Sequence, residues 1–162
     1  MLAPALKRLE VRPAREGDLA AALALLEWEL SKNPWIVRTP ELLKEAVRGK
    51  GREVMACVAE REGELVGFGV YGMISGAVGT GVIHAILTAP RSRRAGIGAR
   101  ILEYASADLA SRRMRVIFAE LPADPYLVRY RALLISHGFL EETRIDDYYR
   151  DGIPQIISRL DL

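Results

Sequence analysis

The sequence predicts a single α/β domain over residues 1–162, and three observations support this fold class. A length of 162 residues is typical of one domain, and no Pro-, Gly- or Ser-rich linker divides the chain. Apolar residues make up 50% of the chain and charged residues 27%, which is close to the average of globular proteins. The hydrophobic pattern changes repeatedly between helical and extended periodicity, so both helices and strands are expected.

The first half of the chain predicts a strand, two helices and a three-stranded meander. Asp18 and Thr39 are suited to N-cap one helix each, and Pro40 suits the first turn of the second helix. Leu19 and Leu26 belong to an apolar face at helical spacing. The expected elements are a strand at 9–12, helices at 18–31 and 39–48, and strands at 54–60, 65–74 and 81–88.

The second half predicts two further helices and three strands. Asp124 and Pro125 resemble an N-cap followed by a first-turn proline, and Gly138 is suited to end that helix. The expected elements are a helix at 96–111, a strand at 115–119, a helix at 124–136 and a hairpin of strands 139–148 and 153–160. The order β-α-α-β-β-β-α-β-α-β-β describes a mixed α/β domain around one sheet.

Composition narrows the function classes. Cys57 is the single cysteine and there are two histidines, so an intramolecular disulfide is excluded and we expect no metal site of the Cys/His zinc kind. No apolar run approaches the roughly 18 residues of a membrane span, and residues 1–8 lack the apolar segment of a signal peptide. The net charge of +2 does not indicate bulk nucleic-acid binding. We therefore expect a soluble, cytoplasmic protein.

The segment 86–98 carries the most chemical information, because a strand, a basic turn and a helix start follow one another. Gly96 and Gly98 allow the backbone to approach a ligand closely. The first NH groups of the helix have no intrahelical partner and carry the positive end of its dipole, an arrangement that suits a pyrophosphate. The third glycine of a dinucleotide fingerprint is absent, since Ile101 stands there. A surface turn with solvated arginines is the alternative.

A wider pattern resembles the GNAT superfamily of N-acetyltransferases. Residues 93–98, Arg-Arg-Ala-Gly-Ile-Gly, are similar to the family's Arg/Gln-x-x-Gly-x-Gly/Ala signature. Residues 11–19 look like its opening, residues 137–139 look like its Gly-Phe stop, and the element order also matches. The resemblance implies a mostly antiparallel sheet of the acyl-CoA N-acyltransferase fold. It also implies acetyl-CoA as cosubstrate, held by Ile86, Leu87, Thr88, Arg93, Arg94, Ala95, Gly96, Ile97, Gly98 and Ala99.

Two residues are candidates for the base that deprotonates an amine. His84 lies four residues before Thr88, where many relatives have a glutamate, and its reference pKa of about 6.5 suits a base. Glu120 lies in a segment, 118–121, that is similar to the Leu-Glu-Val-Arg segment of protein N-terminal acetyltransferases, in which the glutamate serves as base. The alternatives are a half-buried strand histidine and a solvated carboxylate at a strand end.

The proton donor departs from the family pattern. The family's usual tyrosine, four residues before the Gly-Phe pair, is replaced by Leu134. Tyr130 lies one helical turn earlier and would serve only in a shifted helix. Tyr148 and Tyr149 resemble the tyrosine pair of N-terminal acetyltransferases, and we expect one of these two to protonate the leaving thiolate. The other is expected to pack in the sheet.

The acceptor is the least specified part of the prediction. By resemblance, the first two helices and the last hairpin wall the acceptor site, which makes Trp28, Glu29 and Trp35 candidate substrate contacts. We expect an N-acetyltransferase acting on a primary amine, either a small molecule or a protein N-terminus, with a homodimer allowed. Leu134 motivates the alternative of a CoA-binding sensor without catalysis. A nucleic-acid-binding module is a minor third alternative.

Arginine dominates the basic residues, with 19 Arg against four Lys. Seven of these arginines fall between Arg91 and Arg115. Those at 91–94 lie on the predicted phosphate turn, whereas those at 112–115 lie about 15 residues, or roughly 20 Å, further along a helix. We therefore expect replacement of Arg93 to weaken acetyl-CoA binding and replacement of Arg113 to have little effect.

Overall fold

The computed structural model describes residues 8–49 and 52–162, so the signal-peptide prediction for residues 1–8 falls almost entirely outside the described residues. Seven strands and four α-helices follow one another in the predicted order within this part of the chain. Their bounds are β1 Leu9–Pro13, α1 Leu19–Leu30, α2 Thr39–Arg48, β2 Val54–Arg61, β3 Glu64–Met73, β4 Thr80–Thr88, α3 Ile97–Ser111, β5 Val116–Pro122, α4 Val128–Ser136, β6 Leu140–Arg150 and β7 Ile153–Asp161. None of the helices described is long and apolar enough to cross a membrane.

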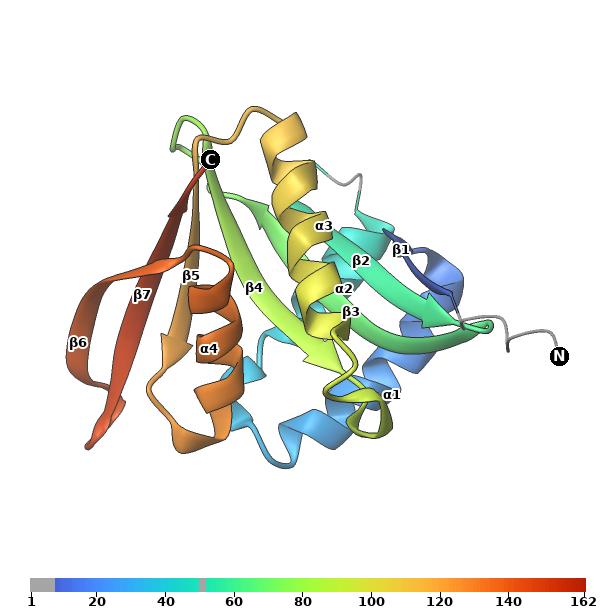
Figure 1. Ribbon diagram of the computed structural model, residues 1–162, viewed down its shortest axis with the longest axis horizontal. Helices are drawn as coiled ribbons and strands as arrows, with labels where there is room; N and C mark the ends of the chain where they lie inside the picture. The colour runs from blue at the N-terminus through green and yellow to red at the C-terminus, as the bar shows by residue number, and fades with distance from the viewer. Residues whose placement is uncertain (1–7, 50–51) are drawn as a thin grey trace, which may run out of the picture.

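The strands form one sheet in the order β1-β2-β3-β4-β5-β7-β6. Only β4 and β5 run parallel, and every other neighbouring pair is antiparallel. The predicted fold class, a mixed and mostly antiparallel sheet flanked by helices, is therefore confirmed. Figure 1 shows α3 and α4 on the near face of the sheet, with α1 and α2 behind it.

Each face of the sheet has its own apolar core. On one face, Ile97, Ile101 and Leu109 of α3 are buried with Leu134 of α4. On the other face, side chains of α1 and α2 pack against β2, β3 and β4. Because both faces are covered, the central strands are apolar almost throughout, as β3 illustrates with seven consecutive buried residues.

The parallel pair β4–β5 comes apart along its length. Its register runs from Thr80 opposite Val116 to Ile83 opposite Ala119 and then ends, although both strands continue. Beyond this point β5 stays paired with β7 as far as Pro122. In Figure 1 the arrowheads of β4 and β5 accordingly lie well apart. The sheet thus contains a fork, defined here as the divergent segments 84–88 and 120–122.

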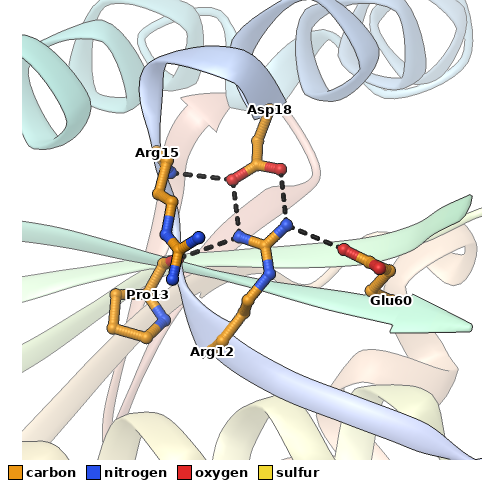
Figure 2. A network of polar contacts seen from close by, with 5 residues as sticks. All are labelled: Arg12, Pro13, Arg15, Asp18 and Glu60. Carbon is orange, nitrogen blue, oxygen red and sulfur yellow. Dashed lines mark hydrogen bonds and ion pairs between the residues drawn. The ribbon is translucent and has the colours of Figure 1, made fainter. Parts of the chain in front are cut away.

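An ion-pair network fixes the entrance to α1 (Figure 2). Arg12 of β1 donates to both carboxylate oxygens of Asp18 at 2.8 Å and to Glu60 of β2 at 2.7 Å. The hydrogen bond from Arg12 is the main reason why the pKa of Asp18 is lowered. Asp18 is the N-cap residue of α1, as predicted, but its carboxylate makes no capping hydrogen bond and accepts instead from Arg12 and from the backbone NH of Arg15.

Several predicted boundaries shift for local reasons. Thr39 is the first residue of α2 rather than its cap, which is Arg38. Asp124 does cap a turn, accepting from the backbone NH of Tyr126, but residues 125–127 form a 3₁₀ turn before α4 starts. Strand β5 extends past Ala119 because its pairing with β7 continues, and this places Glu120 within the strand.

Candidate functional site

The fork contains a cavity of about 600 Å³. Its walls come from α1 and the α1–α2 connection, both arms of the fork, the turn that leads into α3 and the start of this helix, the β5–α4 connection, α4 and β6. Most of the residues predicted from the sequence line it, namely Glu29, Trp35, His84, Ile86, Leu87, Thr88, Arg93, Arg94, Gly96, Ile97, Gly98, Ala99, Glu120 and Tyr149. The candidates Trp28, Ala95 and Tyr148 are not among its lining residues.

The turn between β4 and α3 is built to approach a ligand with its backbone. Arg94 and Gly96 adopt left-handed φ angles of 64° and 74°, so the chain turns sharply before α3. The first turn of α3 has neither an acidic residue nor a side-chain cap, which leaves its NH groups available. A Cβ at Gly98 would lie 3.3 Å from a methyl group of Leu133, so this glycine keeps the wall open. These features fit an anionic group such as a pyrophosphate.

The arginines of this turn have different partners. Arg91 forms an exposed ion pair with Glu64. Arg93 donates to Glu29 at 2.8 Å. Arg94 has no acidic partner among the described residues, and it lines the cavity. Arg94 is therefore the arginine of the turn whose charge is free for a ligand.

Two arginines at the far end of α3 form contacts close to that end and away from the cavity. Arg112 pairs with Asp108 one helical turn earlier, at 3.2 Å. Arg115 donates to the backbone oxygen of Val78 at 2.8 Å. These arginines belong to the closed end of the sheet and not to the cavity.

His84 and Glu120 occupy corresponding positions where the fork opens, and both line the cavity. Each directly follows the last paired residue of its strand, Ile83 on β4 and Ala119 on β5. Burial is the main cause that lowers the pKa of His84, and the nearby Arg38 lowers it further. The imidazole is therefore neutral at pH 7 and able to accept a proton.

A buried amide supports the carboxylate of Glu120. Gln155 of β7 is 4% exposed, and its Nε2 donates to Glu120 Oε2 at 3.2 Å. The carboxylate itself remains exposed to the cavity. The sequence does not predict a role for Gln155, because the position of a glutamine in an apolar strand does not indicate its hydrogen-bond partner.

The structure distinguishes the two tyrosines of β6. Tyr149 lines the cavity and is half-buried, whereas Tyr148 is 55% exposed and lies outside it. Burial is the main cause that raises the pKa of Tyr149, while a hydrogen bond with Gln155 opposes this shift. Its phenol is therefore protonated at neutral pH and can serve as a proton donor.

On α4, the positions of Leu134 and Tyr130 differ in a similar way. Leu134 is fully buried in the core and cannot take part in proton transfer. Tyr130, one turn earlier on the helix, lines the cavity, and burial raises its pKa. A phenol on α4 thus reaches the cavity even though the expected position carries leucine.

The remaining wall of the cavity contains aromatic and polar residues. Glu29 is 6% exposed and accepts a hydrogen bond from the Tyr126 hydroxyl at 2.8 Å. Trp35 donates through Nε1 to Asp124 at 2.9 Å, and its ring lies 5.3 Å from that of Tyr149. The sequence predicts Asp124 only as an N-cap and assigns no role to Tyr126, because no local pattern predicts contacts between residues that lie 89 and 97 positions apart.

Trp28 and Cys57 lie outside the cavity. Trp28 is 40% exposed, with the guanidinium of Arg93 5.5 Å from its ring centre. Cys57 is fully buried, and burial raises the pKa of its thiol to about 12, so it is not a nucleophile at neutral pH. Within residues 8–49 and 52–162, no group of three or more His, Cys, Asp or Glu side chains is placed to hold a metal ion.

Comparison with known proteins identifies the fold and the family. The structure resembles a protein from Desulfovibrio desulfuricans assigned to the GNAT acetyltransferases, with a TM-score of 0.85 and 22% identity over 95% of this chain and 99% of that one. It also resembles the ribosomal-protein-alanine N-acetyltransferase of Brucella melitensis, with a TM-score of 0.76 and 24% identity over 94% and 99% of the two chains. A search of curated proteins found no match. The family model described as "Acetyltransferase (GNAT) family" matches residues 20–130, and the chain therefore belongs to this family.

Proposed function

We propose that the protein transfers the acetyl group of acetyl-CoA to a primary amine by direct attack. The observation that carries the proposal is that His84 and Glu120, at the opening of the fork, line the same cavity as the glycine turn of residues 93–99. One cavity thus offers both an anion-binding backbone and groups that accept protons. Holding both substrates in a single site supplies much of the rate acceleration through proximity.

The end of the cavity formed by residues 93–99, called the turn end, suits the acetyl donor acetyl-CoA. The free NH groups of residues 97–99 and the guanidinium of Arg94 complement a pyrophosphate. Residues 86–88 are unpaired on the side that faces β5, so their backbone is available to the amide groups of a pantetheine arm. Ile86 and Leu133 flank Gly98 and give this groove apolar walls.

At the fork, an amine must lose a proton before it can attack. His84 or Glu120 takes that proton, either directly or through a water molecule. The neutral amine nitrogen then forms a bond to the thioester carbonyl carbon, the carbon–sulfur bond breaks, and the nitrogen releases its second proton to solvent to give the neutral amide. The electron pair of that bond leaves with the sulfur, and the thiolate takes up one proton to give CoA.

Tyr149 is the proton donor that we favour. Its phenol is protonated at neutral pH, and its ring lies in the cavity beside Trp35. Gln155, which donates to Glu120 at 3.2 Å and also opposes the rise that burial causes in the pKa of Tyr149, supports a role for these two residues as base and acid of one reaction. Tyr148, which the sequence did not separate from Tyr149, lies outside the cavity.

The acceptor class follows from the charges at the fork. A carboxylate and a neutral imidazole favour a cationic amine over an anionic acceptor, and the rings of Trp35 and Tyr149 add an aromatic wall. Peptides that begin with alanine are reasonable test acceptors, because two structural neighbours are named ribosomal-protein-alanine N-acetyltransferases. A cytoplasmic location and a homodimer stay predictions from the sequence.

Release of free thiol from acetyl-CoA tests the proposal. The purified chain is incubated with acetyl-CoA and a panel of small amines, amino-acid derivatives and N-terminal peptides, while CoA binding is measured in parallel by calorimetry. Amine-dependent thiol release with formation of the acetylated amine supports an acetyltransferase. CoA binding without turnover across the panel favours a CoA-binding sensor, and the absence of any CoA binding contradicts both functions.

A further inference from the structure

Glu29 joins two side chains that come from the segments following the two arms of the fork. Its Oε2 accepts a hydrogen bond from Arg93, on the turn that follows β4, at 2.8 Å. Its Oε1 accepts one from the hydroxyl of Tyr126, on the 3₁₀ turn that follows β5, also at 2.8 Å. The carboxylate is buried on α1, and both of its oxygens are engaged.

A second hydrogen bond joins the α1–α2 region to the β5–α4 connection. Trp35, in the turn between α1 and α2, donates to Asp124 at 2.9 Å. Asp124 in turn accepts from the backbone NH of Tyr126 at 2.8 Å. The α1–α2 region is therefore attached to the β5–α4 connection at two points. Since the backbone pairing of β4 and β5 stops at Ile83, the two hydrogen bonds of Glu29 link the segments that follow these strands where the sheet does not.

We propose that Arg93, Glu29 and Tyr126 form a brace that sets the width of the fork, with Arg93 acting as a positioning residue rather than a ligand of the pyrophosphate. The inference rests on the proposed function, because it takes the CoA moiety as the occupant of the groove. It assigns the phosphate-binding charge of the turn to Arg94, which has no acidic partner among the described residues.

The charges around Arg93 argue for this assignment. Its guanidinium is held by the carboxylate of Glu29 and lies 5.5 Å from the ring centre of Trp28. A pyrophosphate that drew Arg93 away would leave Glu29 as a buried anion without its cation, which is strongly unfavourable. The Arg93–Glu29 ion pair therefore stays intact when CoA binds. Because the pair has no net charge, it adds little attraction for a phosphate.

The affinity of CoA for Glu29→Ala separates the two roles. This variant breaks the brace and at the same time frees Arg93. We expect CoA binding, measured by calorimetry, to weaken about tenfold, which corresponds to about 1.4 kcal/mol. If Arg93 were a phosphate ligand, its release from Glu29 would leave the affinity unchanged or raise it, and either result would overturn the brace. Glu27→Ala, which removes an exposed carboxylate from the same helix, is the matched control for net charge.

The salt dependence of CoA binding provides a second readout that a general loss of structure would not reproduce. Screening weakens phosphate–arginine attraction, so the loss of a true phosphate ligand flattens the dependence of affinity on salt. We expect a flatter slope for Arg94→Gln, and for Arg93→Gln a weaker affinity with the wild-type slope. Arg113→Gln, at the far end of α3, is the control. A flattened slope for Arg93→Gln contradicts the inference.

Two safeguards keep the outcomes distinct. If Arg93→Gln fails to fold because Glu29 is left unpaired, the double variant Glu29→Gln/Arg93→Gln removes both charges, and the salt slope is read from that protein. If wild-type protein does not bind CoA, the proposed function fails and the brace fails with it. If wild-type protein binds CoA and Glu29→Ala binds it equally well, the brace alone is overturned.

Discussion

The two ends of the cavity are built in different ways. The turn end is one continuous segment, residues 93–99, which offers backbone NH groups and glycines. The fork end is assembled from side chains on four strands, with His84 on β4, Glu120 on β5, Tyr149 on β6 and Gln155 on β7. A backbone surface suits tight, general binding of the donor, whereas separate side chains suit proton transfer. The two ends should therefore respond to mutation in separable ways.

The largest effect is expected when both candidate bases are removed from the fork. In the double variant His84→Gln/Glu120→Gln, kcat should fall about 10²- to 10⁴-fold, the usual contribution of general acid–base catalysis. The affinity for CoA should stay near that of wild type, because the turn is untouched. Steady-state kinetics combined with calorimetry checks both statements, and a large loss of CoA affinity would show that the two ends are not separable.

The pH profile then indicates which base acts. Since burial lowers the pKa of His84 below its usual 6.5, a histidine base is neutral at pH 7 and becomes protonated only as the pH falls through the lowered pKa. The rate should therefore be level above about pH 6.5 and decline on the acid side. If His84→Gln removes that acid limb, His84 is the base. If the limb persists in His84→Gln and disappears in Glu120→Gln, the base is Glu120.

The next effect concerns the turn end. Gly98→Val places side-chain atoms where a single Cβ would already be 3.3 Å from Leu133, and these atoms enter the groove beside the free NH groups. We expect CoA affinity to fall about 100-fold, or about 2.7 kcal/mol, with kcat largely retained at saturating acetyl-CoA. Gly17→Ala is the control, because its Cβ would meet nothing within 4 Å. An unchanged affinity for Gly98→Val would place the donor elsewhere.

A smaller effect distinguishes the tyrosines at the fork end. Tyr149→Phe should lower kcat about tenfold to a hundredfold if its phenol protonates the thiolate. Tyr148→Phe should change kcat far less, because that residue is exposed outside the cavity. Single-turnover rates measured for both variants, and for Tyr130→Phe, decide the matter. A slow Tyr130→Phe beside a normal Tyr149→Phe would move the proton donor to α4.

The smallest effect on CoA binding and catalysis is expected at the start of α1, which lies outside both ends of the cavity. Arg12→Gln removes the contacts to Asp18 and Glu60 and should lower the free energy of unfolding by about 1–3 kcal/mol. The exposed pair Arg48–Glu16 should contribute less than about 1 kcal/mol, as urea titration of Arg48→Gln would show. CoA affinity should not change in either variant. A CoA defect in Arg12→Gln would link the entrance of α1 to the cavity.

The Arg12 network also predicts an acid sensitivity. Because the pKa of Asp18 is lowered in the folded chain, its contribution to stability is complete above the usual carboxyl pKa of 3.8. That contribution is lost as the pH falls through the lowered pKa. The stability gap between wild type and Arg12→Gln should accordingly close in strong acid, and a gap that persists there would contradict the ion-pair account.

The turn end could be predicted from the sequence, since glycines, arginines and a helix start lie within a few consecutive residues. The same holds for the element order, which hydrophobic periodicity and turn residues determine locally. The candidate bases His84 and Glu120 could be named, but not their place in one cavity, which depends on where the pairing of β4 and β5 stops. The partner of Arg93 could not be predicted from the sequence, because Glu29 lies 64 residues away in the chain.

The choice between Tyr148 and Tyr149 was hidden for a different reason. Strand alternation assigns neighbouring side chains to opposite faces only where the register is known. The register of β6 against β7 is interrupted between Ile145 and Arg150, and Asp147 has a left-handed φ of 54°. Such an irregularity changes which side chain faces inward, and no local residue pattern predicts this irregularity.

Amide hydrogen exchange with and without acetyl-CoA tests the central claim most directly, since the claim places the donor on the backbone of the turn and of β4. We predict that saturating acetyl-CoA slows exchange at residues 94–99 and 86–88, while the amides of Arg112 and Arg113 at the far end of α3 are unaffected. Binding that leaves the turn and β4 unprotected, or no binding at all, would contradict the account.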